Sequence, residues 1–163
     1  MNRPSSAVSE LLQREGITHE WVEIPLDPER KPIRSLEELL EGRGMSPSQI
    51  VRSLVFRASS GNFVLLAAPA TARADWGKVR KAVGERRLTL AEPGQVLEAT
   101  GYPIGAVPPI ALPESVRQLV DEGIFSHEEV FIGAGVLGWS IQVRSQDLRK
   151  VLGAAESGRF VKE

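Results

Sequence analysis

The chain has 163 residues, no cysteine, two histidines, and 20 basic against 21 acidic side chains. This length suits one domain with a sizeable core, and the lack of cysteine excludes disulfides, thiol nucleophiles and thiolate metal sites. The near-zero net charge excludes a uniformly basic nucleic-acid coat but not a local patch, and no apolar run suits a membrane span or signal peptide, so we expect a cytoplasmic protein.

The first third of the chain predicts short helices and one extended segment. Apolar residues spaced by three and four predict a helix over Ser6–Glu15, and Gly16 suits its end. Bulky residues predict an extended segment over Ile17–Ile24, and the prolines after it predict a loop. Capping patterns that begin at Ser35 and Ser46 each predict the start of a short helix.

The middle of the chain predicts a hairpin and two helices. Residues 54–56 and 63–66 form apolar strands around a short polar turn that contains glycine. The further elements predicted are a helix over Asp75–Val83 ended by Gly84, a short strand over Leu88–Leu90, and a helix over Pro93–Thr100 ended by Gly101.

The last third predicts an irregular segment, three strands and a closing helix. Residues 101–113 are rich in glycine and proline and cannot be regular. The predicted strands are Val116–Val120, Glu129–Ile132 and Trp139–Val143, and Ser145 is expected to cap a closing helix that Gly153 ends. Intermixed strands and helices with hairpin-length connections predict an α+β fold, in a single domain over residues 1–163.

Charge is unevenly distributed along the chain. Residues 73–87 hold six basic against two acidic side chains, whereas residues 114–129 hold five acidic against one basic. The basic segment is either a solvated helix face or a surface that contacts phosphates. Its candidate contact residues are Arg73, Lys78, Arg80 and Lys81.

Side chains that support metal or covalent catalysis are scarce. His19 and His127 stand far apart in sequence without ligand partners at helical spacing, and no serine has the setting of a nucleophile elbow. The Gly133–Gly138 segment precedes a strand rather than a helix, so it indicates a hairpin and not a dinucleotide site. We expect neither a metal nor a cofactor.

The glycine loop, residues 101–109, is the most informative segment. Gly101 and Gly105 permit close approach of a ligand to the backbone and leave N–H groups free to donate. Such donors stabilise the oxyanion of acyl hydrolysis without a charged side chain. Composition alone also fits an irregular connection in which prolines limit the entropy of the unfolded chain.

Three segments together are similar to one known family. Residues 47–56 (PSQIVRSLVF), 101–109 (GYPIGAVPP) and 130–135 (VFIGAG) resemble the YbaK/prolyl-tRNA synthetase-associated family of aminoacyl-tRNA editing domains, in the family's order and approximate spacing. The Gly-x-x-x-Gly-x-x-Pro loop is the most specific of them. The resemblance runs from about Ile17 to Leu152.

The resemblance implies a mixed, curved β-sheet with a barrel-like core flanked by helices. It implies hydrolysis of the ester of mischarged aminoacyl-tRNA in trans, with aminoacyl-tRNA as partner, proline tRNA as the first acceptor to test, and a small amino acid such as alanine, serine or cysteine. The glycine loop is expected to hold the aminoacyl carbonyl, and the substrate's own ribose hydroxyl helps to position water. The implied site consists of Arg52, Gly101 and Gly105 for catalysis, with Ser53, Ile104, Ala106, Val107, Pro108, Gly133 and Ser140 around the substrate.

Three positions depart from the family pattern. Arg52 replaces the family's lysine, which keeps the charge and permits a bidentate grip on phosphate but changes the shape of the cation. Ser140 stands where some members carry aspartate, and Ala111 where glycine is common. Asp121 matches a frequent family aspartate or simply caps the next turn. The tryptophans Trp21, Trp76 and Trp139 are expected to pack in the core or to stack on adenine.

Two other classes of function stay open from the sequence. One is a binding module that recognises an aminoacyl or adenosine-like end without turnover, favoured by the arginine at position 52. The other is an unrelated interaction domain, which leaves the glycine loop unexplained. The oligomeric state is not readable from the sequence.

Overall fold

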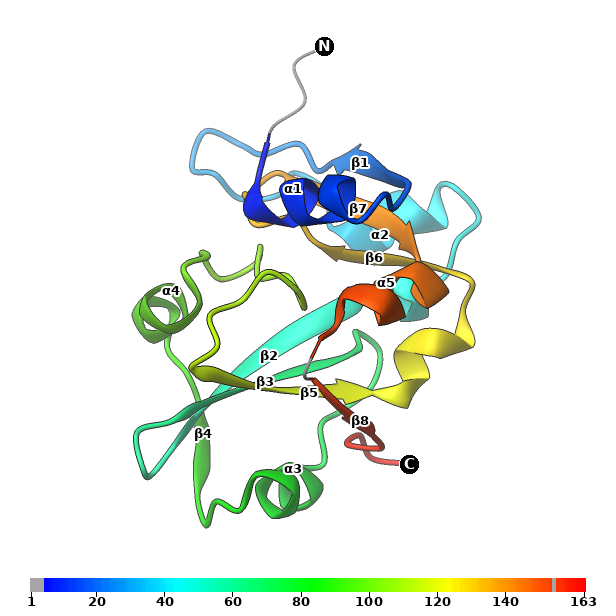
Figure 1. Cartoon of the computed structure of the whole chain (residues 1–163). Coiled ribbons are helices and arrows are strands. Elements are labelled where there is room, and N and C mark those ends of the chain that lie inside the picture. The colour runs from blue at the N-terminus through cyan, green and yellow to red at the C-terminus, as the bar shows by residue number, and fades with distance from the viewer. Residues whose placement is uncertain (1–4, 154) are drawn as a thin grey trace.

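The strands form two sheets rather than one. The computed structural model describes residues 5–153 and 155–163, and in it a three-stranded sheet of order β1-β7-β6 lies above a five-stranded sheet of order β4-β2-β3-β5-β8 (Figure 1). The strands are β1 (His19–Glu23), β2 (Val51–Ala58), β3 (Phe63–Pro69), β4 (Leu88–Leu90), β5 (Val116–Asp121), β6 (Glu129–Gly133), β7 (Trp139–Arg144) and β8 (Glu156–Gly158).

Serine or aspartate begins several of the helices, and glycine ends several of them. They are α1 (Ala7–Arg14), α2 (Leu36–Glu41), α3 (Trp76–Val83), α4 (Pro93–Thr100) and α5 (Ser145–Val151), with 3₁₀ turns at Pro47–Gln49 and Glu122–Ser126. The Ser6 hydroxyl accepts the Ser9 N–H at the start of α1, and the Asp75 carboxylate accepts the Lys78 N–H at the start of α3. Gly84 and Gly101 end α3 and α4 with φ of 70° and 83°.

The five-stranded sheet is mixed, as an α+β fold predicts. β2 and β3 form the expected antiparallel hairpin, β4 pairs antiparallel with the last residues of β2, and β5 and β8 are parallel additions. The two sheets approach each other at a parallel bridge between Ile50 and Phe131. This junction gives the molecule its curved, barrel-like core.

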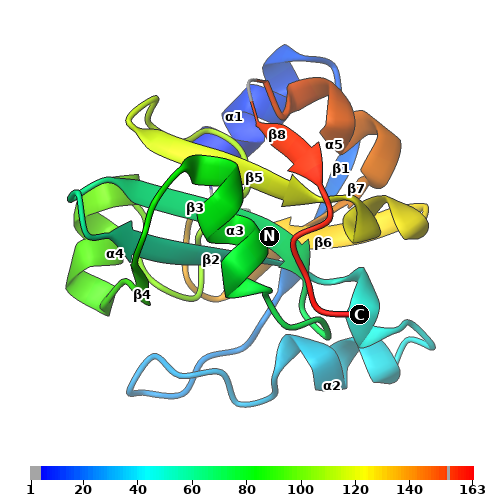
Figure 2. The ribbon, with the colours of Figure 1, turned by 90° about the horizontal axis from the view of Figure 1, so that it is seen from below.

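Three apolar clusters stabilise this arrangement. The largest fills the space between the sheets and includes Val55, Leu65, Ile132 and Ile141, together with residues of α1. A second lies on the other face of the five-stranded sheet, beneath α3, which Figure 2 shows lying across β2 and β3. A third packs α2 against β1 and β6. Because both faces of the large sheet are covered, its middle strand β3 is wholly apolar.

Three expectations need correction. Ser145 does not cap α5: it is the first residue of that helix, and its hydroxyl donates to the carbonyl of His127 at 2.6 Å. The short strand β8 was not predicted, because the sequence Glu-Ser-Gly has no strand propensity and pairs only through tertiary contact with β5. The single central sheet is divided in two. No helix within residues 5–153 and 155–163 is long and apolar enough to cross a bilayer.

Candidate functional site

A cavity opens beside β2, where the two sheets meet. Its volume is about 530 Å³, which falls in the range of small-molecule sites. Its lining includes residues 35–37 around the start of α2, Ile50 and residues 51–55 of β2, Ile104, Gly105 and Val107 of the glycine loop, and Gly133, Trp139 and Ser140 of β6 and β7. Most of this lining is apolar.

The cavity borders an open strand edge. β4 pairs with β2 only at Phe56, Arg57 and Ala58, and the bridge to β6 lies at Ile50, so within the described ranges residues 52–54 of β2 pair with no strand on that side. A cavity along a strand edge is lined by consecutive residues, whatever face of the sheet their side chains occupy. Arg52 and Ser53 therefore both border it, although Arg52 shares a sheet face with Leu54 and Ser53 shares one with Val55.

Arg52 and Glu37 form an ion pair at the cavity. The Arg52 Nη2 lies 3.4 Å from the Glu37 Oε1, and the two side chains are 53% and 38% exposed. An exposed pair of this kind contributes little to stability, about 0.2–1 kcal/mol. Arg52 is thus held by a contact that a stronger anionic ligand can replace. Sequence reasoning missed Glu37, because nothing in the spacing relates α2 to β2.

The two predicted serines differ in their hydrogen bonding. The Ser140 hydroxyl is buried and donates to the Ile132 carbonyl at 3.0 Å. The Ser53 Oγ is buried as well, yet it has no hydrogen-bond partner among the residues that the structure describes. A buried polar atom without a partner costs roughly 1–3 kcal/mol, so Ser53 is the exceptional side chain at this site.

The glycine loop turns sharply at Gly105. The Ala106 N–H donates to the Pro103 carbonyl at 3.1 Å, and Gly105 has φ of 91° at the third position of this turn, as in type II turns. The N–H groups of Gly105 and Val107 donate to no group in the described part of the chain. Both residues line the cavity, so their N–H groups are candidate donors to a ligand there.

The structure places Gly101 outside the cavity. Its N–H donates to the Leu97 carbonyl at 2.8 Å and closes α4, so this group is not free for a ligand. Ala106 and Pro108 are buried residues of the loop and do not line the cavity. Of the ten predicted site residues, the structure brings seven to the cavity: Arg52, Ser53, Ile104, Gly105, Val107, Gly133 and Ser140.

The loop is fastened to the strands beside it. A Cβ on Gly133 would lie 2.3 Å from the Val107 carbonyl oxygen, so only glycine permits this close approach. The Gly135 N–H donates to the Ala106 carbonyl at 2.9 Å. The Gln118 side chain donates to the Pro109 carbonyl at 2.9 Å. These contacts hold the backbone donors in place before any ligand arrives.

Tyr102 connects the glycine loop to the segment that follows it. Its hydroxyl donates to the Ala111 carbonyl at 2.6 Å, and burial raises the pKa of Tyr102, so the hydroxyl keeps its proton well above neutral pH. Ala111 itself has φ of 58°. This left-handed conformation explains why glycine suits that position.

The structure separates the predicted tRNA-contact residues. Arg73 lines a second groove of about 270 Å³ together with Arg52 and Trp76. Lys78 instead borders a depression that contains Asp121 and Glu122. Arg80 and Lys81 lie in the last turn of α3 and line neither groove.

The tryptophans and Asp121 have clear structural partners. Trp76 packs edge-on against Phe56, with 4.9 Å between the ring centroids, and Trp21 packs in the same way against Trp139, with 5.9 Å between the ring centroids. Trp139 also lines the main cavity. The buried Asp121 accepts the N–H groups of Gly123 and Phe160, so it caps the following turn and fixes the C-terminal segment.

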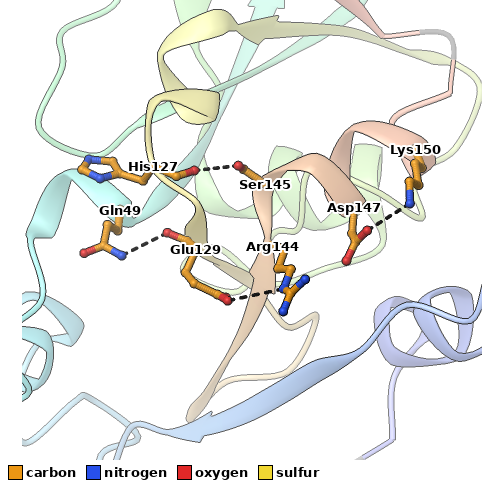
Figure 3. Close-up of polar contacts among 7 residues, drawn as sticks. All are labelled: Gln49, His127, Glu129, Arg144, Ser145, Asp147 and Lys150. Carbon is orange, nitrogen blue, oxygen red and sulfur yellow. Dashed lines mark hydrogen bonds and ion pairs between the residues drawn. The ribbon is translucent and has the colours of Figure 1, made fainter.

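Polar residues at the far ends of β6 and β7 serve structure. Figure 3 shows the Gln49 amide donating to the Glu129 carbonyl, Arg144 beside Glu129, and Ser145 donating to the His127 carbonyl. The His127 ring contacts the Ser48 hydroxyl at 2.7 Å. None of these residues lines the main cavity. Within the described ranges, no three His, Asp or Glu side chains gather as metal ligands.

The fold is an α+β domain in which Arg52 and the glycine loop border one cavity. The profile of the aminoacyl-tRNA editing domain matches residues 30–151, and the chain belongs to this family. This confirms the resemblance seen in the sequence.

The chain is similar to proline–tRNA ligases and to a free-standing deacylase. The chain is 33% identical over 115 residues to a proline–tRNA ligase of Pseudothermotoga lettingae, covering 70% of the chain and 20% of the ligase. It thus spans about a fifth of the length of the ligases it matches. It is 27% identical over 150 residues to the multifunctional Ser/Thr-tRNA deacylase ProXp-y of Escherichia coli K12, covering 86% of the chain and 83% of that protein.

A solved structure supports the same fold. The crystal structure of a candidate trans-editing enzyme for prolyl-tRNA synthetase superimposes with a TM-score of 0.77 at 28% identity, covering 96% of both chains. The chain therefore has the fold of this family along nearly its whole length.

Proposed function

We propose that the chain hydrolyses the ester of mischarged aminoacyl-tRNA in trans, for a small amino acid such as alanine, serine or cysteine. The observation that carries this proposal is the pair of N–H groups of Gly105 and Val107, residues of the cavity lining, which donate to no group among the described residues. Fixed donors of this kind stabilise the oxyanion that forms when water attacks an ester carbonyl. Gly101 is not one of these donors, because its N–H bonds to α4. It ends that helix and so fixes where the glycine loop begins.

In this mechanism side chains bind the substrate, and backbone N–H groups stabilise the oxyanion of the transition state. Arg52 grips the phosphate or ribose of the terminal nucleotide after leaving Glu37. Ser53 belongs to the cavity lining, and a substrate group there supplies the partner that its hydroxyl lacks among the described residues. The substrate's ribose hydroxyl positions the attacking water. No step requires a metal or an enzyme nucleophile.

Similarity to a Ser/Thr-tRNA deacylase supports hydroxylated amino acids among the substrates. Similarity to proline–tRNA ligases supports proline tRNA as an acceptor. The competing function is a binding module without turnover, favoured because arginine replaces the family's lysine at position 52.

A deacylation panel tests the proposal. Alanyl-, seryl- and cysteinyl-esters of proline tRNA are incubated with the protein, and release of free amino acid is measured. We expect rapid release from at least one of them, with kcat/KM lowered on the order of 100-fold in Arg52→Ala because a charge-assisted contact is lost.

Arg57→Ala is the matched control, since Arg57 is exposed on the same strand and outside the cavity. It should retain wild-type activity. Full activity of Arg52→Ala would refute the role of that arginine. Binding of charged tRNA without release of amino acid would show that the chain is a binding module.

A further inference from the structure

Two charged side chains of opposite sign line the main cavity. Within the part of the chain that the structure describes, Glu37 and Arg52 are the charged residues of this lining, and the rest is apolar or carries a serine hydroxyl. Glu37 lies in the first turn of α2, and its neighbour Glu38 is exposed and does not line the cavity. The cavity therefore offers one carboxylate.

An aminoacyl ester brings a positive charge to such a cavity. Its α-amino group, which is largely protonated near neutral pH, stands two bonds from the carbonyl carbon. If the carbonyl oxygen rests on the N–H groups of Gly105 and Val107, the ammonium group enters the same cavity. It needs acceptors there, and a charge of opposite sign gives the strongest hydrogen bond.

Glu37 is available for this contact. Its present partner, Arg52, is an exposed group in a pair of low stability. A substrate that carries both a phosphate and an ammonium group satisfies Arg52 and Glu37 at once. The pair thus separates without leaving either charge alone.

The open edge of β2 supplies a second acceptor. The Val55 carbonyl accepts the Ala91 N–H, while the Ile50 carbonyl accepts the Ala70 N–H on the side of β3. Because backbone groups alternate sides along a strand, Ser53 directs its N–H and carbonyl to the same side as Val55. β4 does not extend to Ser53, so its carbonyl faces the cavity edge unpaired by a strand.

We propose that Glu37 binds the α-ammonium group of the aminoacyl ester, with the Ser53 carbonyl as its neighbour, and so selects substrates with a free amino group. This inference rests on the proposed function. It predicts that acetylation of the α-amino group, which removes its positive charge, slows hydrolysis. This slowing should depend on Glu37 alone.

The test compares two forms of each ester. The alanyl-, seryl- and cysteinyl-esters of proline tRNA are prepared with a free and with an acetylated α-amino group, and kcat/KM is measured for wild type, Glu37→Gln and Glu38→Gln. Wild type and Glu38→Gln should prefer the free form by about 10- to 100-fold. Glu37→Gln should lose that preference by losing activity on the free form only. Circular dichroism and a thermal melt verify that both variants fold.

The outcomes separate this inference from the function on which it rests. If wild type hydrolyses none of the esters, the proposed function fails and this inference with it. If wild type hydrolyses them and Glu37→Gln keeps the preference for the free form, only the inference fails. An equal loss on both forms likewise overturns it, because Glu37 would then act through Arg52 or α2 and not through the ammonium group.

Discussion

At the scale of single residues, Ser53 is set apart by a buried hydroxyl that has no hydrogen-bond partner in the described part of the chain. Its neighbour on the strand, Arg52, is half exposed, and Val51 and Val55 on its own face are buried. A hydroxyl among apolar side chains lowers stability when nothing satisfies it. A residue of this kind is retained at a ligand site because the ligand completes its hydrogen bonding.

We therefore predict opposite effects for two serine-to-alanine substitutions. Ser53→Ala should raise the free energy of unfolding by about 1 kcal/mol, because it removes an unsatisfied polar atom. Ser140→Ala should lower it by about 1 kcal/mol, because it breaks the bond to the Ile132 carbonyl. Urea denaturation measures both changes. A loss of stability in Ser53→Ala would mean that its hydroxyl has a partner in solution, and the proposed ligand contact would lose its basis.

At the scale of elements, the glycine loop and the β6–β7 turn act as one unit. The loop has no regular structure, yet the Ala106 carbonyl accepts the Gly135 N–H, and the Val107 carbonyl fills the space that a Cβ on Gly133 would need. The loop's position is thus set by the end of β6. This explains why glycines from two segments far apart in sequence belong to one site.

Gly133→Ala should displace the loop. An added Cβ meets the backbone of Val107, which cannot move as a side chain does, so we expect a loss of about 3 kcal/mol in the free energy of unfolding. Gly94→Ala is the control, because no atom lies within 4 Å of the added Cβ and the residue is helical; it should stabilise by about 0.5–1 kcal/mol. Thermal denaturation compares the two. Equal stability of Gly133→Ala and wild type would show that the loop does not press on β6.

Local signals predicted most of the elements. Caps at Ser35 and Ser46, terminal glycines, and apolar runs depend on residues close in sequence, and the structure confirms the short helices and the hairpin they indicate. The strand β8 and the division into two sheets depend on contacts between distant segments, which one sequence does not reveal.

The candidate site shows the same division. The glycine loop and Arg52 were found because they form short motifs. The use of the Gly101 N–H in a helix end and the approach of Glu37 to Arg52 both depend on three-dimensional placement. The burial of Ala106 and Pro108 within the loop is likewise a property of the packed fold.

At the scale of the whole molecule, the charge is nearly balanced but unevenly placed. Arg52 and Arg73 border one groove beside the main cavity. Trp76 and several apolar side chains also line this groove. Lys78, from the same basic segment, borders a depression with Asp121 and Glu122. A polyanion approaching the cavity therefore meets two arginines on one side, whereas the field of Lys78 is offset by neighbouring carboxylates.

This placement predicts which basic residues tRNA uses. Arg73→Ala should weaken binding of a charged proline tRNA and reduce the slope of log Kd against log salt by about 1, since one phosphate contact is lost. Lys78→Ala should change neither quantity appreciably. Filter binding at several salt concentrations measures both. A reduced slope in Lys78→Ala, with no change in Arg73→Ala, would place the tRNA backbone on the side of α3 away from the cavity and would separate the basic segment from the proposed site.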